Sequence, residues 1–163
     1  MKPSIYPIVF DQPGTLFIMP KPSGEWLDDD VAHYRSMGAD TIISMLEAAE
    51  IEELSLQNEG IACADNQLDF INHPIQDRGL PDRESFKDLI GIVTERLRKN
   101  EGVAVHCRAG IGRSGMLVCC ALAEFLGSAE DAMDVVSRSR GVEVPDTEEQ
   151  REFIVSIVEE LKN

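Results

Sequence analysis

The sequence lacks the features that mark membrane and secreted proteins. No apolar run approaches the roughly 18 residues that a membrane-spanning helix requires. The opening stretch, MKPSIYPIVFDQPG, does not have the positively charged and then apolar layout of a secretory signal. We therefore expect a cytoplasmic protein that does not use a membrane as a partner.

Basic residues are also scarce. The chain has 15 Lys and Arg against 30 Asp and Glu, which gives a formal net charge of −15. This excess opposes nucleic acid and anionic membranes as general partners. Residues 27–60 hold nine acidic residues against one arginine, and we expect this acidic block to be a solvated face rather than a docking surface. Residues 96–113 instead carry five basic residues, so an anionic substrate would bind there.

The four cysteines form no Cys-x-x-Cys pair and have no histidine at zinc-ligand spacing, so no metal site is predicted. Cys119 and Cys120 are adjacent in the apolar stretch GMLVCCALAEFL, and we expect both to pack inside the protein. Cys63 is expected to be buried as well. A disulfide that shields a reactive cysteine elsewhere is the open alternative for Cys63.

No internal repeat or low-complexity linker divides the chain, so we expect one domain over residues 1–163. Strand composition occurs at residues 15–20, 41–46, 68–75 and 103–107, and helices are expected to start near Asp28, Glu47, Glu84, Ser114, Ala129 and Thr147. Strands and helices alternate only in the first two-thirds of the chain. The expected fold is α/β, a single-domain three-layer fold with a short, largely parallel central sheet of four to five strands flanked by helices.

The stretch VAVHCRAGIGRSG, residues 103–115, is compatible with two kinds of site. Its glycines Gly110, Gly112 and Gly115 form G-x-G-x-x-G, the pattern that seats the pyrophosphate of a dinucleotide. A dinucleotide site also needs a following strand that ends in an acidic residue about 20 positions on. Residues 128–141 show helical spacing instead, so a nucleotide site is not favoured.

The second interpretation uses the reactive side chains of the same loop. Cys107 and Arg113 bracket five residues whose backbone N–H groups would form an anion-binding nest at the start of a helix. Arg113 would hold two phosphoryl oxygens, and the positive field would lower the pKa of Cys107 so that its thiolate attacks phosphorus. Ser114 would donate a hydrogen bond to the sulfur, and His106 would orient the loop. The expected phosphate-binding residues are Arg108, Ala109, Gly110, Ile111, Gly112 and Arg113.

The segment HCRAGIGRS matches the H-C-x5-R-S/T signature of the cysteine-dependent protein tyrosine phosphatases. From about residue 14 to its end the chain resembles their dual-specificity type, in particular kinase-associated phosphatase and its bacterial relatives. The resemblance implies hydrolysis of phosphotyrosine, and also of phosphoserine and phosphothreonine, through a cysteinyl-phosphate intermediate. It implies a phosphorylated protein or peptide as partner and no metal or organic cofactor. We expect a monomer.

The mechanism implied by this resemblance needs a general acid on a mobile loop. The segment HPIQDRGLPD, residues 73–82, offers Asp77 and Asp82. Asp82 sits where the helix over residues 84–100 would take an N-cap, whereas Asp77 has no comparable structural role. The segment resembles the P-I-x-D stretch of dual-specificity enzymes, which places the acid at Asp77. We therefore favour Asp77.

The segment VPDTEEQREFI, residues 144–154, resembles the family segment whose glutamine positions the hydrolytic water, which points to Gln150. Thr147 and Gln150 also form a capping box for the last helix, so a catalytic role and a purely capping role both stay open. Trp26, in the N-terminal half that also resembles the family, is expected to pack in the core or in a loop.

Three other functions use the same loop. A phosphatase of a non-protein substrate would act on a phosphoinositide, an inositol phosphate or an RNA 5'-phosphate. A lipid is disfavoured because Ala109 and Ile111 stand where phosphoinositide phosphatases carry lysines. A rhodanese-like sulfur carrier would use Cys107 but not an acid in residues 73–82. A catalytically silent module would bind a phosphopeptide without hydrolysing its phosphate ester.

Overall fold

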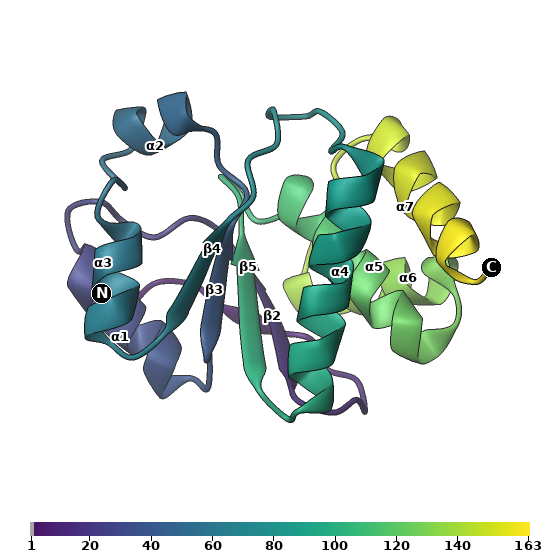
Figure 1. The fold of residues 1–163 in the computed structure, drawn as a ribbon, viewed down its shortest axis with the longest axis horizontal. Helices are drawn as coiled ribbons and strands as arrows, with labels where there is room; N and C mark the ends of the chain where they lie inside the picture. Colours follow the sequence, from purple (N-terminus) through teal and green to yellow (C-terminus); the bar gives the residue numbers. More distant parts are fainter. Residues whose placement is uncertain (1) are drawn as a thin grey trace.

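A computed structural model of the chain describes residues 2–163, in which five strands form one sheet in the order β1-β2-β5-β3-β4 (Figure 1). The strands are β1 (Tyr6–Pro7), β2 (Thr15–Met19), β3 (Thr41–Ser44), β4 (Asp69–Asn72) and β5 (Gly102–His106). Strands β2 to β5 pair in parallel, and β1 runs antiparallel to β2 at one edge. The largely parallel sheet that we expected is confirmed.

Helices cover both faces of the sheet. They are α1 (Leu27–Ser36), α2 (Ala48–Glu53), α3 (Glu59–Asp65), α4 (Arg83–Arg98), α5 (Arg113–Leu126), α6 (Ala129–Arg140) and α7 (Glu148–Leu161). Helices α1 to α3 lie on one side of the sheet and α4 to α7 on the other (Figure 1). Successive residues of a strand point to opposite faces. Accordingly Ile42 and Ala104 belong to the apolar cluster under α1 and α3, whereas Ile43 and Val105 belong to the cluster under α4 to α7. The three-layer arrangement is thus confirmed.

Local sequence explains the two helices nearest the site. The apolar stripe of α4 is buried, as its spacing predicts; its members are Phe86, Leu89, Ile90, Val93 and Leu97. The helix begins after Asp82, whose carboxylate accepts the Ser85 N–H at 3.0 Å. Helix α7 begins with the capping box of Thr147 and Gln150. Strand β1 and helix α3 were not predicted, because a two-residue edge strand and a two-turn helix carry little periodicity.

The cysteines confirm the expected burial. Cys63, Cys119 and Cys120 are all buried, and no disulfide occurs within residues 2–163. Cys63 lies in the apolar cluster under α1 and α3, whereas Cys107 lies in the cluster on the opposite face of the sheet. The structure therefore gives no support to a disulfide between Cys63 and Cys107.

The central position of β5 determines where the site forms. This strand lies between β2 and β3, so the chain after His106 emerges at the carboxyl edge of the parallel strands. Ligands of open α/β sheets bind at this edge. Across residues 2–163, the helices are too short or too polar for any of them to traverse a bilayer.

Candidate active site

The loop from Cys107 to Gly112 joins β5 to α5, and its backbone is held from outside by hydrogen bonds to its carbonyls. Arg140 of α6 donates to the carbonyl oxygens of Ala109 and Gly110, each at 3.0 Å. Gly110 has φ +74°, and a Cβ there would lie 2.4 Å from the Met19 carbonyl oxygen, so a side chain is excluded. With these carbonyls pointing outward, loop N–H groups are free to turn toward an anion.

Cys107 is almost completely buried at the base of this loop, with 3% of its surface exposed. Its Sγ lies 3.1 Å from the Oγ of Ser114. Burial alone would raise the pKa of the Cys107 thiol. Hydrogen bonds from the Ser114 hydroxyl and from the N–H groups of Ser114, Ile111 and Gly110 outweigh burial and bring the pKa below its ordinary value. Cys107 therefore has the character of a reactive thiolate.

Arg113 is the first residue of α5 and is also buried. Its Nη1 donates to Glu50 Oε1 at 2.6 Å and to the Ile75 carbonyl at 2.8 Å, and its Nη2 donates to Glu50 Oε2 at 2.9 Å. The hydrogen bond from Arg113 holds the pKa of Glu50 below its ordinary value. The guanidinium plane is thus fixed by a carboxylate that the sequence did not single out.

The acidic block, residues 27–60, is therefore not only a solvated face, and that expectation was wrong for three of its members: Asp30, which accepts the N–H of Ser23, and two glutamates at the site. Glu50 and Glu59 are both buried. Glu50 pairs with Arg113, and Glu59 lies 2.6 Å from His106. Burial of a carboxylate is costly unless it has a charged or hydrogen-bonded partner, and the chain supplies one partner for each.

The loop of residues 73–82 brings one of its two aspartates to the site. Asp77 Oδ1 lies 3.3 Å from Arg113 Nη2, and the Asp77 side chain is 60% exposed. Asp82 instead caps α4. The neighbouring Arg78 pairs with Asp146 at 3.1 Å, which links this loop to the turn before α7. The structure therefore confirms the predicted cap at Asp82 and leaves Asp77 as the aspartate of this loop that contacts Arg113.

Gln150 is buried where the turn before α7 meets the loop. Its Oε1 accepts the N–H groups of Asp146 and Thr147, each at 3.2 Å. Its Nε2 is buried and has no hydrogen-bond partner among the described residues. A Cβ on Gly112 would lie 3.1 Å from that nitrogen, so Gln150 directly adjoins the loop. The capping hydrogen bonds thus orient the amide and leave its donor end free.

These side chains surround one cavity of about 210 Å³. Its lining consists of Asp77, Arg78, Cys107, Arg108, Ala109, Ile111, Gly112, Arg113, Asp146 and Gln150. Among the residues that the sequence indicated, Gly110, Ser114 and His106 do not line the cavity. Ser114 contacts the sulfur of Cys107, and His106 contacts the carbonyl of Cys107. Glu50 likewise supports the cavity from outside, through Arg113.

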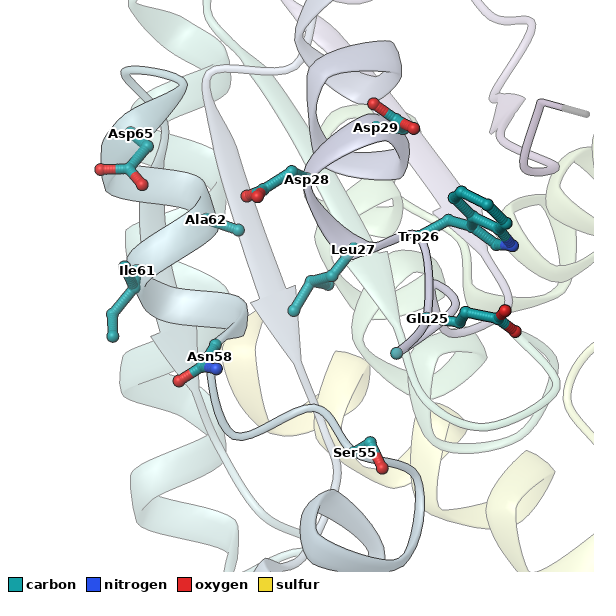
Figure 2. A pocket seen from close by; sticks show the side chains of 11 residues that line it. Glu25, Trp26, Leu27, Asp28, Asp29, Ser55, Asn58, Ile61, Ala62 and Asp65 are labelled. Carbon is teal, nitrogen blue, oxygen red and sulfur yellow. The ribbon is translucent and has the colours of Figure 1, made fainter.

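A larger cavity of about 590 Å³ lies between α1 and α3, away from this loop (Figure 2). Its lining includes Asp28, Asp29 and Asp65, whose charges oppose a phosphate. Trp26 lies at this cavity, in the loop that precedes α1, with 59% of its surface exposed, so of the two expected positions the core is wrong and the loop is observed. The smaller cavity at Cys107 is the one that suits an anion.

Sequence comparisons agree with this geometry. The family described as "Polymorphic toxin system, DSP-PTPase phosphatase" matches residues 21–125. Protein tyrosine phosphatase type IVA 3 of Mus musculus is 28% identical over 121 residues, which are 73% of this chain. The match spans 65% of the length of that mouse protein. A putative tyrosine phosphatase of Invertebrate iridescent virus 3 is 41% identical over 61 residues, which are 35% of this chain and 25% of the viral protein.

Solved structures share the fold over nearly the whole chain. Kinase associated phosphatase, in a form whose catalytic-site cysteine is replaced by serine, has a TM-score of 0.87 at 20% identity, covering 99% of this chain and 97% of that one. Tk-PTP in its active form has a TM-score of 0.75 at 24% identity, covering 94% and 97%.

Proposed function

The chain belongs to the DSP-PTPase phosphatase family of polymorphic toxin systems, within the cysteine-dependent dual-specificity phosphatases, and we propose that residues 1–163 form one domain that hydrolyses phosphomonoesters. The proposed substrates are phosphotyrosine, and also phosphoserine and phosphothreonine, in proteins. The observation that carries the proposal is the convergence of Cys107, Arg113 and Asp77 on one cavity of about 210 Å³. The proposal includes a monomer in the cytoplasm. It also includes no nucleic acid or membrane as partner, and the net charge of −15 supports this part.

In the first step, the Cys107 thiolate attacks phosphorus, an S–P bond forms and the bond from phosphorus to the substrate oxygen breaks. Asp77 gives its proton to that leaving oxygen. The loop N–H groups and Arg113 bind the three non-bridging oxygens of the phosphoryl group, on which the transition-state charge develops. The ion pair with Glu50 supports this role because it fixes the guanidinium before the substrate arrives.

In the second step, water attacks phosphorus of the phosphocysteine, the S–P bond breaks and Cys107 leaves as a thiolate. The Asp77 carboxylate takes a proton from the water, and Ser114 donates a hydrogen bond to the departing sulfur, 3.1 Å away. We assign the positioning of the water to Gln150. Its Oε1 is occupied by the cap, and its unpartnered Nε2 supports this role beside the capping one.

Phosphate release from matched peptides that carry phosphotyrosine, phosphoserine or phosphothreonine tests the proposal. We expect turnover of the phosphotyrosyl peptide, abolished in Cys107→Ser. A phosphoinositide and a 5'-phosphorylated RNA in the same assay test the non-protein substrates. Sulfur transfer from thiosulfate to cyanide without phosphate release would indicate a sulfur carrier and overturn the proposal. Equal peptide binding by the wild type and Cys107→Ser, with no release from either, would indicate a silent module.

A further inference from the structure

A buried acid lies next to the site and has no part in the two steps described above. Glu59 of α3 has 2% of its surface exposed, and its Oε2 lies 2.6 Å from Nε2 of His106. His106 ends β5 and is itself fully buried. Its other ring nitrogen, Nδ1, lies 3.0 Å from the carbonyl oxygen of Cys107. The histidine thus connects Glu59 to the backbone of the nucleophile.

The two contacts restrict where protons reside on the pair. A carbonyl oxygen only accepts hydrogen bonds, so Nδ1 of His106 carries a proton and donates it to Cys107. The contact between Nε2 and Glu59 needs one further proton. If that proton is on the nitrogen, His106 is an imidazolium facing a carboxylate. If it is on Glu59, both groups are neutral.

Three other ionisable groups lie near Glu59 on this face of the sheet: Tyr34, Cys63 and Asp30. Burial and the nearby acids raise the pKa of Tyr34 above its ordinary value, and burial raises the pKa of Cys63 to about 12, so both are neutral near pH 7. Asp30 of α1 is engaged by the backbone N–H of Ser23 at 2.8 Å. Glu59 is therefore the carboxylate available to His106 on this face.

Burial alone would lower the pKa of His106. The charge of Glu59 and the hydrogen bonds to Glu59 and to the Cys107 carbonyl outweigh burial, and the pKa of His106 lies above its ordinary value. A carboxylate and an imidazolium buried together offset each other's desolvation cost, which neither could do alone.

We propose that Glu59 is a positioning residue of this phosphatase site: it holds His106 as an imidazolium that anchors the Cys107 carbonyl and stabilises the Cys107 thiolate. The inference rests on the proposed function. His106 adjoins Cys107 in the chain, and Glu59 lies on the far nitrogen of its ring. The positive charge is thus the nearer of the two to the nucleophile, and the pair favours the thiolate.

The test is the rate at which iodoacetamide alkylates Cys107, measured against pH by peptide mass spectrometry. In Glu59→Gln the hydrogen bond is kept but His106 becomes neutral. We expect the midpoint of alkylation to rise, so that below the wild-type midpoint the rate falls about 3- to 10-fold. Asp65→Asn is the matched control, since it removes an exposed carboxylate from the same helix, and its profile should equal that of the wild type. Identical profiles for Glu59→Gln and the wild type would overturn the inference.

This assay does not depend on turnover. A wild type that releases no phosphate contradicts the proposed function, whereas Glu59 is judged only by the shift between variant and wild type. If Glu59→Gln does not fold, nitrogen-15 NMR of the wild-type histidine rings decides, because the chain has only three histidines. Protonation of both nitrogens of His106 at pH 7 supports the inference, and a neutral ring overturns it.

Discussion

Glu50 holds the guanidinium of Arg113 through two hydrogen bonds, 2.6 Å to Oε1 and 2.9 Å to Oε2. Arg113 has five N–H donors in a planar fork, and this pair uses two nitrogens to fix the plane. An arginine that is oriented before the substrate binds needs no reorganisation in the transition state. Glu50 thus belongs to the working site although it does not line the cavity.

Replacing Glu50 tests that relationship. Glu50→Gln keeps the size of the side chain but has one oxygen acceptor and no charge. We expect kcat/KM for a phosphotyrosyl peptide to fall about 10- to 100-fold, mainly through kcat. Glu52→Gln, on an exposed position of the same helix, is the control and should retain wild-type kinetics. Equal kinetics for both variants would show that Arg113 does not need Glu50.

The partners of Glu50 and Glu59 could not be predicted from the sequence, in contrast to the phosphate-binding loop. The spacing of Cys107 and Arg113 is local, so the sequence alone predicted their loop, and the stripe of α4 predicted its buried face. The partner of Glu50 is 63 residues away, and that of Glu59 is 47 residues away. In a run of acidic residues, local composition does not distinguish a solvated carboxylate from one that pairs with a buried cation. Only the fold, which brings α2 to Arg113 and α3 to His106, makes that distinction.

The two aspartates of the 73–82 loop should separate by function. Asp77→Asn cannot protonate a leaving oxygen, so we expect kcat for phosphotyrosine to fall about 100-fold. The fall in kcat should be smaller for p-nitrophenyl phosphate, because its leaving group is a weaker base and depends less on protonation. Asp82→Ala should keep kcat and lower the melting temperature by roughly 2–4 °C, through loss of the cap on α4. A large loss of kcat in Asp82→Ala, with kcat kept in Asp77→Asn, would instead assign the general acid to Asp82.

Arg140 should act on phosphate binding. Its two hydrogen bonds hold the Ala109 and Gly110 carbonyls outward, and its guanidinium lies 4.2 Å from the centre of the Tyr6 ring. Arg140→Met should raise KM and the inhibition constant of inorganic phosphate about 10-fold, because the loop loses its preferred orientation. Arg138→Met changes an exposed arginine of the same helix and should alter neither constant. If the inhibition constant of inorganic phosphate rises in both variants, the cause is instead a general loss of positive charge.

Gln150 should affect only the second step. In Gln150→Ala the water loses its positioning group, so the alcohol or phenol product should appear in a burst, followed by a steady state about 10-fold slower than that of the wild type. Thr147→Ala removes the other half of the capping box and is the control. It should destabilise α7 without producing a burst. If neither variant shows a burst and both have the same steady-state rate, Gln150 serves only as a capping residue.

The central claim is that phosphate passes through the sulfur of Cys107. Acid quenching during turnover of a phosphotyrosyl peptide, followed by mass spectrometry of the peptide that contains Cys107, tests it directly. We predict one phosphate on Cys107 in the wild type, more of it in Gln150→Ala, and neither phosphocysteine nor phosphate release in Cys107→Ser. Phosphate release by Cys107→Ser at the wild-type rate would contradict the mechanism.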